Sequence, residues 1–174
     1  MAIGIRDLTS VDDECIGTGS SSRVYLYQAA PIGTQSGQYF AVKRLDKRTI
    51  ADPRQILLEK GVLSSLHHPS IVKLYGTDKD EHYLYFILEY CPNGSLASFI
   101  GQCITGVSDD SVRVLSCELL LSIQYLHEQM GIVHNDIKPG NILISDQHHI
   151  KLCDFGSAFY VKEGLRLRIG FHCD

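Results

Sequence analysis

The sequence has no long hydrophobic run, no secretory leader pattern and no extended basic block. Its longest apolar stretch, Tyr83 to Cys91, is interrupted by Glu89 and is far shorter than the roughly 20 residues that a membrane helix needs. The first nine residues carry Arg6 and Asp7 and lack an apolar core, so no secretory signal is expected. The 16 Lys and Arg against 20 Asp and Glu leave a formal charge of −4, which does not favour nucleic acid as the partner.

The cysteines show no CxxC pair, and several stand in apolar surroundings such as Leu152 to Phe155. This pattern predicts small buried hydrophobic residues in a reducing compartment rather than a disulfide framework or a zinc site. We therefore expect a soluble protein of the cytoplasm, with the nucleus as a further location. The six positions are Cys15, Cys91, Cys103, Cys117, Cys153 and Cys173.

Length and composition suit one globular domain. A chain of 174 residues that is 44% hydrophobic and 21% charged can bury a core without disulfides or metal. Disorder, collagen and coiled coil are excluded.

The first ninety residues predict strands, because β-branched and aromatic residues recur in short runs between turn residues. One helix is expected among them, starting at Asp52 and Pro53 and ending before Pro69. The predicted strands are Asp12–Gly17, Arg23–Ala29, Gln38–Leu45, Val72–Gly76 and Tyr83–Glu89.

The second part of the sequence predicts helices first and short strands afterwards. Helices are expected at Ser95–Ile100 and from Asp109 to about Gln129, with Gly131 as the stop. Short apolar runs then return at Ile132–His134, Ile142–Ser145 and Ile150–Cys153. The sequence thus predicts an α+β chain with a strand-rich lobe followed by a helical lobe, joined at Glu89–Gly94.

A glycine-rich turn stands between the first two predicted strands. Glycine lets the backbone turn tightly and brings N–H groups close to a phosphate. An ordinary hairpin turn without a ligand is the alternative for this stretch. Its residues are Gly17, Thr18, Gly19, Ser20, Ser21, Ser22, Arg23 and Val24.

Lys43 ends an apolar strand, where its ammonium group can contact phosphate oxygens or simply be solvated. Glu59 is the acid of the following predicted helix that has apolar neighbours, and it is a candidate partner for Lys43.

The segment from His134 to Asn141 concentrates polar chemistry on a loop that contains Pro and Gly. Asp136 can accept a proton from a hydroxyl, and Lys138 can neutralise a phosphoryl group. Asn141 and the downstream Asp154, which begins an Asp-Phe-Gly run, offer oxygen ligands for a hard cation. A random polar loop is the alternative, and it accounts poorly for this set in this order.

Taken together these motifs resemble the eukaryotic protein kinases, from about Val11 to about Tyr160. Lys138, two places after Asp136, is similar to the serine/threonine type. Within the family the chain resembles the phosphoinositide-dependent kinases of the AGC group, on the segments LDKRTI, HPSIVKLY and Asn93–Leu96. The resemblance implies a kinase domain over residues 11–174, with a complete small lobe at about 11–90 and a partial large lobe at about 95–174.

The resemblance also implies the roles of the site residues. Asp136 would be the catalytic base, Lys138 would steady the γ-phosphate, Lys43 with Glu59 would hold the α- and β-phosphates, and Asn141 and Asp154 would bind Mg²⁺. Leu88 would be the gatekeeper, and Leu63, Leu74, His134 and Phe155 would stack between the lobes. ATP would contact the glycine-rich turn and the adenine slot, formed by Ile16, Gly17, Thr18, Gly19, Ser20, Ser21, Ser22, Val24, Ala41, Leu143 and the backbone of Glu89 and Cys91.

Three features depart from the family pattern. Asn135 stands where many kinases have an arginine that docks a phosphorylated activation loop, and a neutral amide cannot replace that charge. Ser95 stands where relatives have an acid for the ribose. The sequence ends at Asp174 without an Ala-Pro-Glu motif, and its tail from Gly164 leaves the family pattern, as an alternative or shifted reading frame would.

Without later helices, we expect an apolar patch on the long helix, formed by Leu119, Leu120, Ile123 and Leu126. The functions to be weighed are therefore Mg²⁺- and ATP-dependent phosphorylation of protein Ser/Thr, binding of ATP or a regulator without transfer, and a chain that does not persist folded. The resemblance to the phosphoinositide-dependent kinases further implies that client kinases or a regulator would dock on the small lobe, with Lys47, Lys60 and Thr77 at a phosphate-binding edge. The alternative for these three is that they are simply exposed polar residues.

Overall fold

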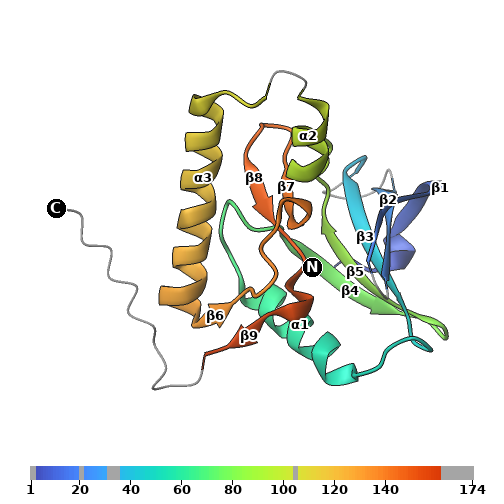
Figure 1. Cartoon of the computed structure of the whole chain (residues 1–174). Helices are drawn as coiled ribbons and strands as arrows, with labels where there is room; N and C mark the ends of the chain where they lie inside the picture. The colour runs from blue at the N-terminus through green and yellow to red at the C-terminus, as the bar shows by residue number, and fades with distance from the viewer. Residues whose placement is uncertain (1–2, 20–21, 31–35, 104–105, 162–174) are drawn as a thin grey trace.

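The computed structural model describes residues 3–19, 22–30, 36–103 and 106–161. It confirms the expected α+β architecture, with a five-stranded antiparallel sheet on one side and the long helix on the other (Figure 1). Predicted features at Ser20, Ser21, Cys173 and the tail from Gly164 lie outside the described residues.

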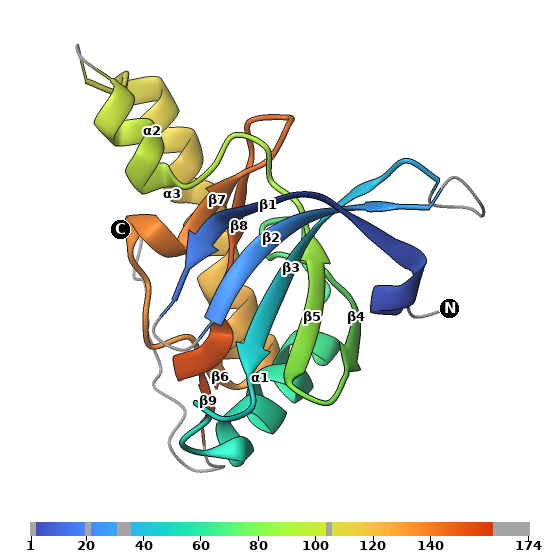
Figure 2. The same ribbon diagram turned by 90° about the vertical axis from the view of Figure 1, so that its right-hand side faces the viewer.

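The sheet has the strand order β1-β2-β3-β5-β4, and Figure 2 shows it facing the viewer. A bulge interrupts the β1–β2 pairing between Ser10 and Cys15. The fourth strand is shifted along the chain from its predicted place, because the backbone of Val72 bonds Leu152 instead of a neighbouring strand of the sheet. The bounds are β1 Leu8–Thr18, β2 Ser22–Ala29, β3 Tyr39–Asp46, β4 Leu74–Lys79 and β5 Tyr83–Glu89.

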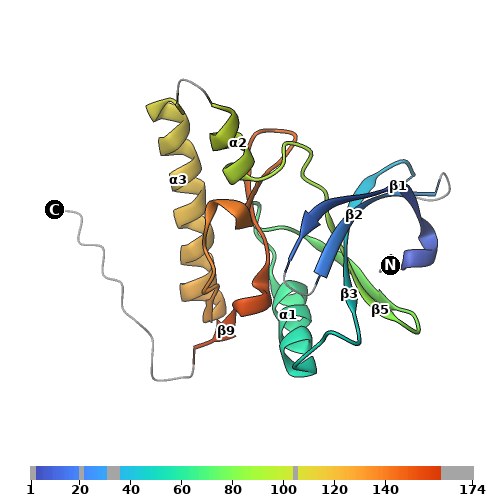
Figure 3. The same cartoon turned by 45° about the vertical axis from the view of Figure 1, so that its right-hand side comes forward.

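The helix α1 (Pro53–Ser65) packs beside one face of this sheet (Figure 3). Asp52 caps its first turn by accepting a hydrogen bond from the backbone N–H of Arg54 at 2.9 Å, and Pro53 fits the first helical position. Its buried residues include Glu59, Val62 and Leu63. The predicted capping signal is therefore confirmed, and it marks where α1 begins.

The opposite face of the sheet is covered by the segment before β1. Ile3 and Ile5 pack against a cluster that includes Phe40, Tyr85 and Ile87. The backbone N–H of Ile5 also donates to the carboxylate of Asp78 at 2.8 Å. A Cβ on Gly76 of β4 would lie 2.2 Å from the carbonyl oxygen of Ile3, so this contact requires glycine.

The second half begins with α2 (Leu96–Gln102) and α3 (Asp109–Gln124), and the last turn of α3 widens into a π-helical turn at Tyr125–Met130. Gly131 ends it in the left-handed conformation, as the sequence predicts. Three small strands follow as predicted: β6 Ile132–Val133, β7 Ile142–Ile144 and β8 Ile150–Leu152. A fourth, β9 Phe159–Tyr160, was not predicted and pairs with β6. The hairpin β7–β8 lies between α3 and the sheet (Figure 1).

The expected apolar patch on the long helix differs in its members. Leu126 is fully buried and Leu119 packs against the main core, so both were predicted wrongly to be exposed. Leu120 and Leu121 are each 56% exposed, and Ile123 is half-buried. The exposed apolar surface of α3 is thus displaced by part of a turn from the predicted stripe.

The described cysteines are free thiols, and no disulfide links them among the described residues. Cys117 is exposed, which corrects the prediction that the cysteines are buried. Among the described helices, none is long and apolar enough to cross a membrane.

Candidate functional site

A cleft of about 480 Å³ lies between the glycine-rich turn, the end of β5 and the hairpin β7–β8. It is bounded on the sheet side by Val24 of β2 and Ala41 of β3, and on the other side by Leu143 of β7. The described residues predicted to contact ATP line this one cleft: Ile16, Gly17, Thr18, Gly19, Ser22, Val24, Ala41, Lys43, Glu89, Cys91 and Leu143. Leu88 and Ser95 also line it.

Lys43 makes ionic contacts with two carboxylates from different parts of the chain. Its Nζ lies 2.6 Å from Oε1 of Glu59 on α1 and 3.1 Å from Oδ1 of Asp154. The Lys43 and Glu59 side chains are only 12% and 4% exposed, so solvent screens this pair weakly. Burial lowers the pKa of Lys43, but the charges of Glu59 and Asp154 outweigh it and leave the pKa raised. Lys43 is therefore a fixed cation inside the cleft.

The loop 134–141 is anchored by the buried His134. Its Nε2 contacts the carbonyl oxygen of Cys153 at 2.9 Å, and its Nδ1 accepts the backbone N–H of Asp136 at 3.2 Å. An Nδ1 acceptor and an Nε2 contacting a carbonyl oxygen fit the neutral ring, and burial lowers the pKa of His134. The ring also packs edge-on against Phe155, with centroids 4.7 Å apart. A neutral histidine thus ties this loop to the end of β8.

Asp136 and Lys138 do not line the cleft themselves but join it through Asn141. Lys138 Nζ lies 2.8 Å from Asp136 Oδ2, and the amide nitrogen of Asn141 donates to the same carboxylate oxygen at 2.8 Å. These hydrogen bonds from Lys138 and Asn141 lower the pKa of Asp136. Its carboxylate is therefore ionised at neutral pH and can act as a proton acceptor.

Asn141 and Asp154 suit a magnesium ion that is held together with phosphates. Because the amide nitrogen of Asn141 is turned to Asp136, its carbonyl oxygen is available as a ligand, and Asp154 has a second carboxylate oxygen beyond the one that meets Lys43. Among the described residues no cluster of three or more His, Cys, Asp or Glu is present. Magnesium in nucleotide sites keeps several waters and takes one or two protein oxygens plus phosphates, so this sparse donor set fits.

Two residues of this region have unusual backbone conformations. Asn135 and Asp154 adopt φ angles of 64° and 61°. Asparagine and aspartate enter this left-handed region more readily than most residues, and such strain clusters at functional sites. The side chain of Asn135 is exposed, and the conformation gives a local reason for asparagine there.

The residues expected to stack between the lobes lie in or against one core cluster. Leu63 and Phe155 belong to it, and Leu74 packs against it, while His134 contacts Phe155. A further link was not predicted: Gln55 Nε2 of α1 donates to the carbonyl oxygen of Gly156 at 2.6 Å. Gln55 gave no sequence signal, because an exposed glutamine on a helix has no pattern that names its partner.

The two thiols in the cleft wall, those of Cys91 and Cys153, are unreactive at neutral pH. Burial, followed by the nearby carboxylate of Glu89, raises the pKa of Cys91 to about 12. Burial, followed by Asp154, does the same for Cys153. Both stay protonated at neutral pH and act as apolar lining.

The three residues of the predicted docking edge differ in their exposure and in their hydrogen bonding. The ammonium group of Lys47 donates to the backbone carbonyl of Asp80, so it is already engaged by the turn between β4 and β5. Lys60 is exposed on α1, whereas Thr77 is half-buried in β4.

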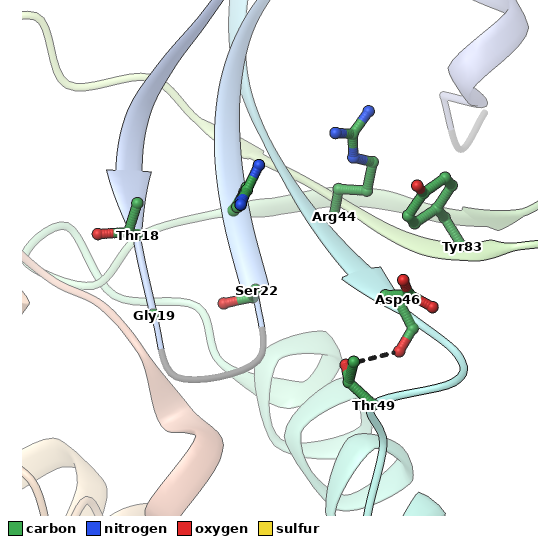
Figure 4. Close-up of a pocket in the computed structure, with 8 residues that line it drawn as sticks. Thr18, Gly19, Ser22, Arg44, Asp46, Thr49 and Tyr83 are labelled. Atoms are coloured by element: carbon green, nitrogen blue, oxygen red, sulfur yellow. Dashed lines mark hydrogen bonds between the residues drawn. The ribbon is translucent and has the colours of Figure 1, made fainter.

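A second cavity of about 480 Å³ borders the glycine-rich turn, and Figure 4 shows its lining. It shares Thr18, Gly19 and Ser22 with the cleft. Its other walls carry Arg23, Arg44, Asp46, Thr49 and Tyr83. The Arg44 guanidinium lies over the rings of Tyr25 and Tyr83, and Asp46 is paired with Arg48. None of the predicted catalytic residues lines this second cavity.

Comparison with known proteins agrees with this geometry. Residues 10–169 match the family described as protein kinase domain. The chain is 42% identical over 162 residues to 3-phosphoinositide-dependent protein kinase B of Dictyostelium discoideum, covering 90% of this chain and 16% of that protein. It is 38% identical over 151 residues to the cAMP-dependent protein kinase catalytic subunit of the same organism, covering 85% and 22%.

A human relative shows the same likeness. The chain is 38% identical over 146 residues to human 3-phosphoinositide-dependent protein kinase 1, covering 82% of this chain and 25% of that protein. The chain therefore spans a quarter or less of the length of these three relatives. The family match over most of the chain, together with the cleft described above, shows that it belongs to the protein kinase family, with relatives in the phosphoinositide-dependent and cAMP-dependent groups.

Proposed function

We propose that this chain carries the site for transfer of the γ-phosphoryl group of ATP to serine or threonine hydroxyls of proteins. The observation that carries the proposal is the convergence of six polar residues around one cleft. Lys43 and Glu59 come from the small lobe, and the other four are Asp136, Lys138, Asn141 and Asp154 from the later part of the chain.

Each residue has a defined part in such a transfer. Asp136 accepts the proton of the acceptor hydroxyl as its oxygen bonds to the γ-phosphorus and the bond to the ADP oxygen breaks. Lys138 lies 2.8 Å from Asp136, so it can bind an oxygen of the phosphoryl group while Asp136 holds the hydroxyl. Lys43 binds the α- and β-phosphate oxygens and is kept in place by Glu59.

Asn141 and Asp154 would hold Mg²⁺, which offsets phosphate charge when it is bound. The hinge after β5 would bind the adenine. The amide of Glu89 already donates to the carbonyl oxygen of Lys73 at 2.9 Å, so of its two backbone groups only the carbonyl can serve the base edge, together with the backbone of Cys91.

The serine/threonine preference is supported by Lys138 and by relatives whose names are those of protein kinases, one of them "Serine/threonine-protein kinase RUNKEL" of Arabidopsis thaliana. The proposed acceptors are proteins with accessible serine or threonine hydroxyls. The proposed location is the cytoplasm, with the nucleus as a further location.

The second candidate is a domain that binds ATP or a regulator without transferring phosphate. It is favoured by the exposed Leu120 and Leu121 of α3, an apolar surface on the helical side of the molecule. A client kinase or regulator on the small lobe belongs to the same candidate, although Lys47 is engaged by the β4–β5 turn.

The test is phosphate transfer from labelled ATP and Mg²⁺ to a mixed protein acceptor, beside Asp136→Asn as a matched control. We expect transfer above the control, because the variant keeps the shape of the site but removes the proton acceptor. Equal incorporation in both proteins would reject the transfer proposal. Nucleotide-dependent thermal stabilisation that is lost in Asp154→Ala would then leave the binding candidate standing.

A further inference from the structure

Glu89 and Lys151 form a shielded ion pair at the hinge, and we call this pair the hinge clasp. Glu89 is the last residue of β5, where the chain leaves the sheet for the helical half. Its Oε1 lies 2.7 Å from Nζ of Lys151 in β8, and the two side chains are 23% and 17% exposed. The clasp therefore joins the hinge of the small lobe to a strand of the other half of the molecule.

The second carboxylate oxygen of Glu89 is also bound. Its Oε2 accepts the backbone N–H of Lys73 at 3.1 Å, and the backbone N–H of Glu89 donates to the Lys73 carbonyl. Each carboxylate oxygen of Glu89 thus has its own partner, Lys151 for Oε1 and the backbone of Lys73 for Oε2. A carboxylate fixed in this way presents Lys151 with a partner of fixed position rather than a mobile surface charge.

Lys151 stands directly across the β7–β8 hairpin from Leu143, the residue at the floor of the cleft. Cross-strand partners lie close together on the same face, so a force that fixes Lys151 also fixes Leu143. The strand β8 is tied to the segment before β4 as well, because Val72 N–H donates to Leu152 carbonyl at 3.0 Å. The clasp therefore lies where three parts of the chain meet: the hinge that begins at Glu89, Leu143 at the base of the cleft, and the inter-lobe segment between α1 and β4 that contains Val72.

Other titratable groups lie near the clasp. His68, from the same inter-lobe segment, has a lowered pKa because of burial and then the positive charge of Lys151. Glu89 is the carboxylate in direct contact with Lys151, and Asp146 lies near enough to influence Cys91. Removing one partner of a shielded pair leaves the other charge poorly solvated, so the segments must move apart to hydrate it.

We propose that the hinge clasp is a positioning device that sets the width of the adenine slot between the hinge and Leu143. This inference rests on the proposed nucleotide function of the cleft. The phosphate end of the cleft depends on other contacts, those of Lys43 with Glu59 and Asp154. The clasp therefore acts on recognition of the base and leaves recognition of the phosphates unchanged.

The experiment compares two ligands across matched variants. Isothermal titration measures the affinity of the purified chain for MgADP and for adenosine, which has the base and ribose but no phosphate. The variants are Lys151→Met, Glu89→Gln, both together, and Lys151→Arg as the conservative rescue. Arg48, which is paired with Asp46, has a side chain that is 79% exposed, so Arg48→Met serves as the control for loss of one surface charge.

In Lys151→Met, the dissociation constants for adenosine and MgADP rise by the same factor, about tenfold. Lys151→Arg restores most of the affinity, and the double variant is no weaker than either single variant, because one pair has been removed. In Lys43→Met, by contrast, only MgADP binding weakens. Thermal unfolding checks that each variant is folded.

Unchanged adenosine affinity in a folded Lys151→Met protein overturns the proposal, as do additive losses in the double variant. If the unmodified chain binds neither ligand, the proposed function fails. The effect of the clasp on the hinge and on the β7–β8 hairpin is then measured on the ligand-free protein. Amide hydrogen exchange at residues 89–94 and 142–152 should then be faster in Lys151→Met than in Arg48→Met. Equal exchange in the two variants rejects the clasp.

Discussion

The small lobe and the loop 134–141 each contain a lysine–carboxylate pair, and the two pairs differ mainly in solvent exposure. Lys43 and Glu59 are 2.6 Å apart with side chains 12% and 4% exposed, whereas Lys138 and Asp136 are 2.8 Å apart with 56% and 35% exposed. Contact length alone therefore says little about what a pair contributes. A shielded pair fixes structure, and an open pair can exchange its partner for a substrate.

Breaking the shielded pair should have the largest effect on folding. Glu59→Ala leaves Lys43 in a weakly solvated site with only Asp154 to balance it, and we expect a loss of about 3 kcal/mol in the free energy of unfolding. Urea denaturation measures this loss. Lys60→Ala, the exposed neighbour on α1, is the control and should change the value by less than about 0.5 kcal/mol. Equal losses in the two variants would contradict the contrast between shielded and open charges.

The neutral His134, which anchors the loop 134–141, should contribute an intermediate, pH-dependent amount to the free energy of unfolding. Because burial lowers the pKa of folded His134, the unfolded chain binds a proton below about pH 6.5 that the folded chain does not. The stability contributed by neutral His134 is present above that pH. It is lost as the pH falls toward the folded pKa, by up to about 1.4 kcal/mol per pH unit.

Denaturation of the unmodified chain and of His134→Gln between pH 8 and pH 5 tests this sign. The unmodified chain should lose more stability on acidification than the variant. Parallel curves would mean that other groups produce the pH dependence.

Removing the open pair should have the smallest effect on folding and a large effect on chemistry. Lys138→Met should leave the free energy of unfolding within about 1 kcal/mol, because both side chains are solvated. Phosphate transfer should fall by about a hundredfold, because a cation that meets the developing charge is lost. Denaturation and the transfer assay are run on the same preparation. A fall in stability like that of Glu59→Ala would show that the open pair is structural after all.

The sequence predicted elements best where local signals act alone. Tyr83–Glu89 was found with its expected bounds, and Asp52 with Pro53 marked the start of α1. The place of β4 and the existence of β9 depend on pairing with distant segments, Leu152 for Val72 and Ile132 for Tyr160. A window of neighbouring residues contains no information on such partners.

For the site, residue types could be predicted but not all of their contacts. The family motifs place Lys43, Asp136 and Asp154 in the right order; the structure brings Lys43 and Asp154 to one cleft and joins Asp136 to it through Asn141. The clasp of Glu89 and Lys151 was not foreseen, because the two residues are 62 positions apart and the family pattern assigns a role only to the backbone of Glu89. Lys47 shows the opposite case, since a predicted docking cation is held by a backbone carbonyl.

The contact between Ile3 and Gly76 bears on how this domain should be cut for study. The family match begins at residue 10, and a protein engineer guided by it would start expression there. That boundary would strip Ile3 and Ile5 from the outer face of the sheet and expose part of the cluster around Phe40 and Tyr85 to water. The folding unit therefore begins at least seven residues before the family match. Gly76 belongs to this extension, because only glycine leaves room at that position for the backbone of Ile3.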